Sequence, residues 1–269
     1  MTSSNLHREL APVSQAAWAE IEEEAIRTFS RNIAGRRVVD MPEPQGTAFS
    51  SLAAGHVTDG REIVPGAQTR SRDVIPVLEV KVPFTVTRQA VDDVLRGSVD
   101  SDWQPVKDAA TTIAAAEDTV VFHGYDQLGM TGMVDASSNE PIAIPEDVRD
   151  LPRSVAQALT RLRLAGVEGP YTLVVSADLY TAISETTDHD YPILEHLQRV
   201  LKEDGKIIWA PALNGALVVT TRGGDFELHL GVDLSIGYDS HDAQNVHLYL
   251  QETFAFRVAS DEASVPLTA

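Results

Sequence analysis

The sequence predicts an α+β fold, because its helical and strand-like segments are unevenly distributed along the chain. Residues 14–35 carry apolar side chains at three- and four-residue steps, which is the helical period. Residues 171–221 alternate short apolar strands with helical segments. Residues 226–258 are almost entirely strand-like, with apolar and polar side chains alternating. A helical start, a mixed middle and a strand-rich end together indicate an α+β architecture.

The first segment is predicted to be one amphipathic helix followed by a basic corner. Ser14 is the expected N-cap, and Gly35 is expected to end the helix in a left-handed conformation. Glutamates fill its first half and arginines its end, which matches the helix macrodipole. The apolar stripe either packs on the protein's own core or partly serves another molecule, and its pattern alone leaves both open. The stripe consists of Trp18, Ile21, Ala25, Phe29 and Ile33.

Residues 41–73 lose the helical period and are rich in Pro, Gly, Ser and Thr. A connection of this length is unusual in a compact domain, where the median is about 4–6 residues. One interpretation is a two-stranded excursion that packs on something outside its own domain. The other is a disordered surface loop.

Residues 77–123 are predicted to form a strand and two helices. Apolar and polar side chains alternate over 77–86, and Pro83 indicates an edge strand or a bulge. Thr87 is expected to cap a short helix that Gly97 closes. A longer helix is expected over 102–123, with an alanine-rich centre that permits close packing.

The rest of the chain is predicted to contain an inserted α/β unit and a final β-rich part. From about residue 124 to 222, a helix beginning near Pro152 is followed by alternating strands and helices. The last predicted strand, 245–258, has one apolar face in which Glu252 is the single charged residue.

Composition excludes several classes of function. The chain has 269 residues, a formal net charge of −19 and no cysteine, so disulfides, thiolate metal sites and a cysteine nucleophile are excluded. Nucleic acid is not an expected partner, because phosphate backbones require a basic surface. No run approaches the roughly 18 apolar residues of a membrane helix. The first 20 residues contain no uninterrupted apolar core, so we expect no signal peptide and a cytoplasmic location.

No catalytic motif is present, and the sequence predicts no enzyme. Phosphate-binding glycine loops, a nucleophile elbow and a zinc-protease motif are all missing from it. The adjacent carboxylates Glu117 and Asp118 point to different sides of a helix and form no acid/base dyad. Polar residues near His189 have metal-ligating side chains, but a polar loop between two helices is the simpler interpretation, so no metal is expected. His189 is alternatively a pH-sensitive group in a narrow passage.

Five sequence blocks resemble, in order and spacing, the encapsulin shell proteins, also known as the linocin-type bacteriocin family. The resemblance extends from about residue 6 to 265 and is greatest to actinobacterial members of the classical family. The blocks are LAPVSQAAWAEIEEEAIRTFSRNIAGRRVVD, FTVTRQAVDDVLRG, GVEGPYTLVVSADLY, RGGDFELHLGVDLSIGY and LYLQETFAFRV.

This resemblance implies a tailed-phage major capsid protein fold and self-assembly into a closed icosahedral shell. About sixty copies would be needed, each making several heterologous contacts. The implied divisions are an N-terminal cargo-facing helix (1–40), an extended loop (41–74), a first peripheral part with the spine helix (75–123), an apical domain (124–222) and a second peripheral part (223–269).

The resemblance also implies partners and sites. Family shells enclose a cargo enzyme in the cytoplasm, commonly a dye-decolorising peroxidase or a ferritin-like protein, through the cargo's C-terminal targeting peptide. Apolar pockets would hold alternate side chains of that peptide. By position, the implied peptide-binding residues are Ile26, Phe29, Ile33, Asp40, Leu234 and Ile236. The implied lining of a five-fold pore is Glu185, Asp188, His189, Asp190 and Tyr191.

Some family members hold a flavin stacked on a tryptophan, but this chain has Gln89 at that position, so we expect no cofactor. Two alternative functions remain. One is a phage or prophage capsid protein that encloses nucleic acid, which the acidic net charge disfavours. The other, and the least favoured, is a secreted bacteriocin or hydrolase, for which no catalytic residues are found.

Overall fold

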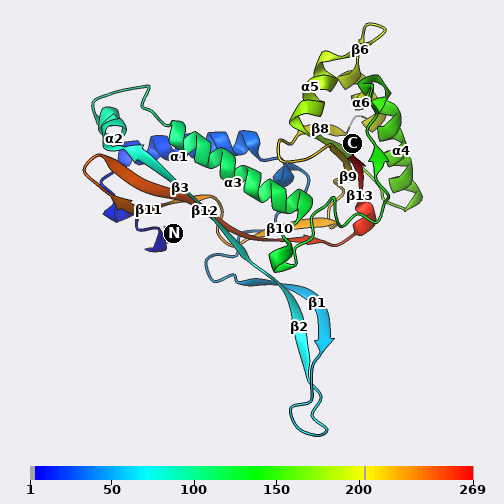
Figure 1. Ribbon diagram of the computed structural model, residues 1–269, viewed down its shortest axis with the longest axis horizontal. Helices are drawn as coiled ribbons and strands as arrows, with labels where there is room; N and C mark the ends of the chain where they lie inside the picture. Colours follow the sequence, from blue (N-terminus) through cyan, green and yellow to red (C-terminus); the bar gives the residue numbers. More distant parts are fainter. Residues whose placement is uncertain (1–3, 203, 269) are drawn as a thin grey trace.

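A computed structural model describes residues 4–202 and 204–268. Figure 1 shows an elongated frame of helices over a sheet, a second compact unit at one end of it, and a two-stranded hairpin that projects away from both. We call these the frame, the apical domain and the extended hairpin. The frame consists of α1 (Gln15–Asn32), α2 (Arg88–Leu95), α3 (Gln104–His123), β3 (Leu78–Thr87), β10 (Phe226–Leu230), β11 (Ser235–His241) and β12 (Asn245–Val258).

The frame joins segments from both ends of the chain. β12 pairs antiparallel with β3, β10 and β11, so β3 forms an edge of this sheet and tolerates Pro83 as predicted. α3 packs on β3 and β12, and α1 packs on α3. Trp103 Nε1 donates a 3.1 Å hydrogen bond to Glu20 Oε2, which fastens α1 to the start of α3. Both predicted N-caps are confirmed: the Ser14 and Thr87 hydroxyls accept hydrogen bonds from helix N–H groups at 3.2 and 3.1 Å.

The extended hairpin consists of β1 (Ser51–Asp59) and β2 (Arg70–Pro76). These strands pair antiparallel over most of their length, and the tip between them points away from the body of the molecule (Figure 1). The predicted two-stranded excursion is therefore confirmed and the disordered loop is wrong. Ile63 and Val64 near the tip are exposed, so the hairpin carries apolar side chains with no cover from its own chain.

The apical domain has a mixed five-stranded sheet in the order β4-β13-β9-β5-β8. Helices α4 and α6 pack on one face of this sheet, and the other face joins the core of the frame. Its elements are β4 (Ile142–Ala143), α4 (Leu151–Leu164), β5 (Tyr171–Val175), α5 (Ala177–Glu185), β6 (Thr187–Asp188), β7 (Tyr191–Pro192), α6 (Ile193–Leu201), β8 (Lys206–Trp209), β9 (Ala216–Thr220) and β13 (Ser264–Thr268). Short 3₁₀ turns lie at Ser4–Leu6, Arg8–Leu10, Gly35–Arg37, Asp126–Leu128, Val148–Asp150 and Asp261–Ala263.

The C-terminal strand requires a correction. The resemblance implies that 223–269 belongs as a whole to the peripheral part, but β13 pairs with β9 and β4 inside the apical sheet. Val265 and Leu267 are fully buried there, and this burial draws the chain out of the frame and into the apical core. A five-residue strand carries too little periodicity to reveal its partner from the sequence.

The end of α1 also differs from the prediction. The helix ends at Asn32, Ile33 is extended, and Gly35 has no left-handed φ. A side chain at position 35 would come within 3.0 Å of Asp118 Oδ1 and a Val121 methyl group. Glycine is therefore needed here for close approach to α3, not for a left-handed turn.

Candidate functional site

The structure brings four of the six predicted peptide-binding residues into one apolar cluster. Phe29, Ile33 and Ile236 belong to the core between α1, α3 and the sheet, and half-buried Leu234 packs against it. Phe29 is only 4 % exposed, whereas Ile26 on the same helix is 58 % exposed. Ile26 is not part of this cluster; because residues three apart on a helix are neighbours, it lies one turn before Phe29 on the exposed edge of α1, which we call the rim.

Asp40 lies elsewhere. Its backbone bridges to β10, donating to the Phe226 carbonyl and accepting from Leu228 N–H at 2.8 and 2.9 Å. Its carboxylate accepts the N–H of Gly224 and lines a cavity of about 300 Å³ between the frame and the apical domain. None of the other five predicted residues lines that cavity.

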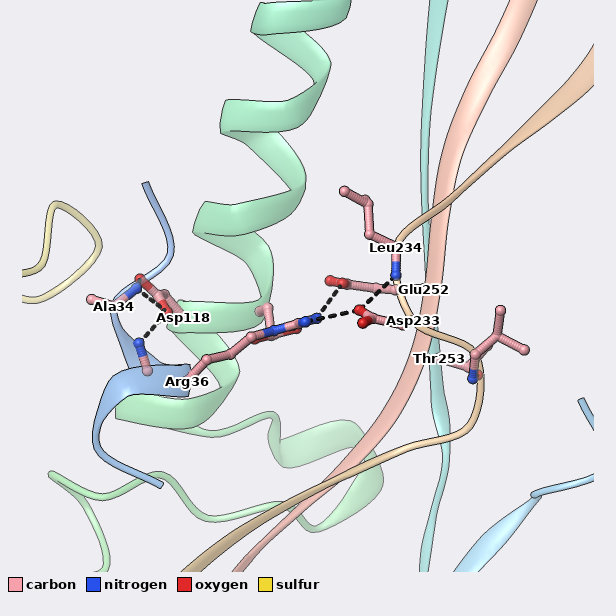
Figure 2. Close-up of polar contacts among 10 residues, drawn as sticks. Ala34, Arg36, Asp118, Asp233, Leu234, Glu252 and Thr253 are labelled. Carbon is pink, nitrogen blue, oxygen red and sulfur yellow. Dashed lines mark hydrogen bonds and ion pairs between the residues drawn. The ribbon is translucent and has the colours of Figure 1, made fainter. Parts of the chain in front are cut away.

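Arg36 links the Phe29 side of the apolar cluster to the Leu234 side, and the sequence analysis did not identify it as a site residue. Its guanidinium lies over the Phe29 ring, with Cζ 4.8 Å from the ring centroid. It pairs with Glu117 at 2.6 Å, Asp233 at 2.8 Å and Glu252 at 3.3 Å. Figure 2 shows this group, with Arg36 reaching from the end of α1 towards β12 and the loop before β11.

The same contacts position Leu234. Asp233 Oδ1 accepts both the Arg36 guanidinium and, at 2.7 Å, the backbone N–H of Leu234 (Figure 2). Leu234 is therefore held in place through Asp233 by an arginine that also covers Phe29.

Asp118 anchors the chain just after α1. Its carboxylate accepts the N–H of Ala34 at 2.9 Å and of Gly35 at 2.7 Å, and its side chain is fully buried (Figure 2). Burial raises the pKa of Asp118 to about 7, against the lowering effect of those N–H donors, and the nearby Glu117 charge adds to the rise.

Arg36 is a single positive charge facing three carboxylates, those of Glu117, Asp233 and Glu252. Burial and the charge of Glu117 raise the pKa of Glu252 well above its ordinary value. Burial alone would lower the pKa of Arg36, but hydrogen bonds and charge from Glu117 and Asp233 raise it. The geometry therefore holds Arg36 charged and favours a proton on Glu252. Two features of the sequence pointed to this group: Glu252 on an otherwise apolar face, and the arginines that follow α1. Neither feature showed that Arg36 and Glu252 would pair with each other.

The predicted pore residues lie on an exposed projection of the apical domain. β6 and β7 form a hairpin between α5 and α6, where a polar loop was expected (Figure 1). His189 and Asp190 at its tip have φ of 47° and 63°, the pattern of a type I′ turn. His189 Nδ1 lies 2.8 Å from Asp188 Oδ1, and Arg199 donates to the Tyr191 hydroxyl at 3.0 Å. Glu185 is exposed at the end of α5.

Within residues 4–202 and 204–268, no three His, Asp or Glu side chains are grouped to hold a metal ion. Gln89, at the position of the family's flavin-stacking aromatic residue, is exposed on α2. A helix long and apolar enough to cross a membrane is also missing from this part of the chain.

Comparison with known proteins agrees with this architecture. Residues 3–255 match the family model described as "encapsulating protein for peroxidase". The type 1 encapsulin shell protein of Brevibacterium linens is 60 % identical over 98 % of this chain and 99 % of its own. The protein of Rhodococcus erythropolis, 56 % identical over 98 % of this chain and 99 % of its own, is likewise described as a type 1 encapsulin shell protein.

Two solved structures share the fold at low identity. The virus-like particle from Pyrococcus furiosus has a TM-score of 0.64 at 14 % identity, covering 93 % of this chain and 98 % of that one. Mycobacterium phage Che8 has a TM-score of 0.55 at 16 % identity, covering 87 % and 90 %. The predicted tailed-phage capsid fold is thus confirmed, with the extended hairpin as its loop. With this fold and a close relative matched along almost its whole length, the chain belongs to the encapsulin shell proteins, which form multi-copy, capsid-like bacterial compartments.

Proposed function

We propose that this shell encloses a cargo enzyme in the cytoplasm and holds it by a short peptide at the cargo's C-terminus. The family description, an encapsulating protein for peroxidase, supports a peroxidase as the cargo, and the sequence resemblance implies the dye-decolorising class. A ferritin-like protein is the alternative that the sequence resemblance implies. The peptide would dock on the apolar rim formed by Ile26 and Leu234.

The exposure of Ile26 is the observation that carries this proposal. The packing of α1 on the core does not use Ile26. Its large apolar side chain is 58 % exposed to solvent, although it lies near the Phe29 cluster. An extended peptide that places alternate apolar side chains on this rim would bury it. In this arrangement Phe29, Ile33 and Ile236 form the floor beneath the peptide. Asp40 remains a proposed contact for a basic or backbone group, but it lies outside the apolar rim.

The test is co-expression of the shell with a peroxidase that carries its own C-terminal peptide. Ile26→Asp should leave particles intact by negative-stain microscopy but remove most of the co-purifying peroxidase, because a carboxylate would be desolvated against the apolar rim. Ile26→Val should retain cargo. Arg31→Asp, an exposed charge change on the same helix, is the matched control. Ile26→Asp particles that carry the wild-type amount of peroxidase would contradict the docking site.

We also propose that the β6–β7 hairpin lines a five-fold pore through which small substrates reach the cargo. Its exposure, its carboxylates and the histidine at its tip support this role, since rings of charge control passage electrostatically. Asp190→Asn should change the entry of charged substrates more than that of neutral ones. The readout is peroxidase turnover inside the shell relative to the free enzyme, and equal ratios for both substrate classes would argue against a pore lining here.

A further inference from the structure

The apical domain carries opposite charges on two opposite flanks. Helix α4 contains three arginines and no acidic residue, although the chain as a whole has a net charge of −19. Helix α5 contains two acidic residues and no Lys or Arg. α6 packs against both helices and lies between them, so the two flanks face away from each other (Figure 1).

The exposed face of α4 is a basic stripe. Arg153, Gln157 and Thr160 recur at helical spacing and are exposed, and with Ala156 and Arg161 they line a shallow groove. Within the described residues, no arginine of α4 forms an ion pair with a carboxylate. Arg161 donates to the Glu140 carbonyl and Arg163 lies over the Tyr171 ring, so the charge of exposed Arg153 is the part of this flank that remains available to a partner.

The exposed face of α5 is the matching acidic stripe. Asp178, Thr181 and Glu185 recur at i, i+3 and i+7 and are all exposed. α5 is also loosely covered: Ile183 is its only fully buried side chain, and Leu179 and Tyr180 remain partly exposed. This flank thus offers negative charge together with apolar surface that its own chain leaves uncovered.

We propose that the α4 flank of one subunit docks on the α5 flank of the next copy, and that this contact closes the apical domains into a ring. Contacts between two different flanks of the same chain are heterologous, and repeating one rotation closes a ring. The charge complementarity selects a second copy of this chain as the partner, because each copy supplies both the basic and the acidic stripe. The inference rests on the multi-copy shell and adds which surfaces meet within it.

Charge reversal with rescue tests the pairing. Arg153→Glu alone and Asp178→Arg alone should each reduce assembled particles severalfold, while subunit circular dichroism stays unchanged. The double variant Arg153→Glu/Asp178→Arg should recover assembly, and the conservative variants Arg153→Lys and Asp178→Glu should assemble normally. Single reversals should assemble worse as the salt concentration falls, because screening weakens like-charge repulsion. Normal assembly of both reversals, or no recovery in the double variant, would overturn the proposal.

Cross-linking supplies a second, independent measurement, since the chain has no cysteine of its own. Particles of the Gln157→Cys/Thr181→Cys variant, treated with a short bis-maleimide, should give a denaturing-gel ladder that ends at one closed ring. Each single-cysteine variant should run as a monomer on the denaturing gel, because the α4 flank contacts an α5 flank and two copies of the same cysteine do not come together. Intact particles without a ladder would overturn the contact between flanks. Absence of wild-type particles would instead count against the shell itself, so the two failures are distinguishable.

Discussion

The frame buries several charged side chains, whereas residues 124–222 of the apical domain bury none among the described residues. The buried carboxylates of the described residues all lie outside 124–222, and several converge where α1, α3 and β12 meet. Within the apical domain the buried polar residues are uncharged, and the helices pack through aliphatic side chains. Buried charge fixes how the distant segments of the frame join, while exposed apical charge is left for contacts with other copies. The difference indicates where each domain is sensitive to substitution.

The frame should be most sensitive at Arg36. Arg36→Met removes the only positive charge that contacts the buried Glu117 and Glu252 in the described structure, and an uncompensated buried charge costs about 3–5 kcal/mol. We expect the thermal midpoint to fall by on the order of 10 °C in scanning fluorimetry. Arg37→Met is the matched control, because exposed Arg37 donates to the Ser30 carbonyl and forms no ion pair within the described residues, so its cost should stay within about 0.5 kcal/mol.

A compensated variant sharpens this prediction. If uncompensated charge is the cause, adding Glu117→Gln and Glu252→Gln to Arg36→Met should recover much of the lost midpoint. If the cause were lost packing over Phe29, the triple variant would be no more stable than Arg36→Met.

The apical domain should be most sensitive to loss of apolar volume. Leu162 is fully buried and Leu164, two residues later on the same helix, is 83 % exposed. Leu162→Ala should cost about 2–5 kcal/mol, through lost burial and a residual cavity. Leu164→Ala should cost less than about 0.5 kcal/mol. Urea unfolding of both variants measures this difference, and equal costs would mean that apolar packing does not hold this domain.

Strong periodicity made much of the fold predictable. The long frame helix α3, the capped α2 and the final strand β12 all followed from residue patterns. The two-stranded excursion was one of two interpretations that the pattern of residues 41–73 left open. The last strand of the apical sheet did not, because its five residues pair with β9 more than forty positions away. Local patterns specify an element better than its partner.

The candidate site was less predictable for the same reason. Helical spacing placed Phe29 on the apolar stripe, and only the family resemblance added Ile26. How much of Phe29 is covered depends on Arg36, and the position of Arg36 depends on Glu117 and Glu252. Those ion pairs span 81 and 216 positions of sequence. Glu117 and Asp118 are adjacent on α3, yet each anchors a different residue after α1.

The pH dependence of stability should also originate in the frame. The pKa of Asp118 is about 7 in the folded chain and about 4 when unfolded, so its contribution is fully present below about pH 4 and is lost as the pH rises towards 7. The raised pKa of Glu252 acts in the same direction. Asp118→Asn has no titrating group at this position. The thermal midpoint of the variant, measured relative to that of the wild type, should therefore rise by a few degrees as the pH is raised from 4.5 to 7.5. A constant difference across this range would exclude Asp118 as a titrating group.

The smallest effect is expected at the hairpin tip, which is far from either core. The His189 side chain is 95 % exposed and pairs with Asp188, and such exposed pairs contribute less than about 1 kcal/mol. Its φ of 47° matters more, because a β-branched residue is strained there whereas asparagine is tolerated. His189→Asn should therefore leave hydrogen exchange of the 187–192 amides unchanged, and His189→Val should speed it. Neither should move the global midpoint by more than about 2 °C, since the hairpin opens without disturbing the apical core. A larger shift for His189→Val alone would mean that the tip is coupled to the core and that the apical domain is not held by its apolar layer alone.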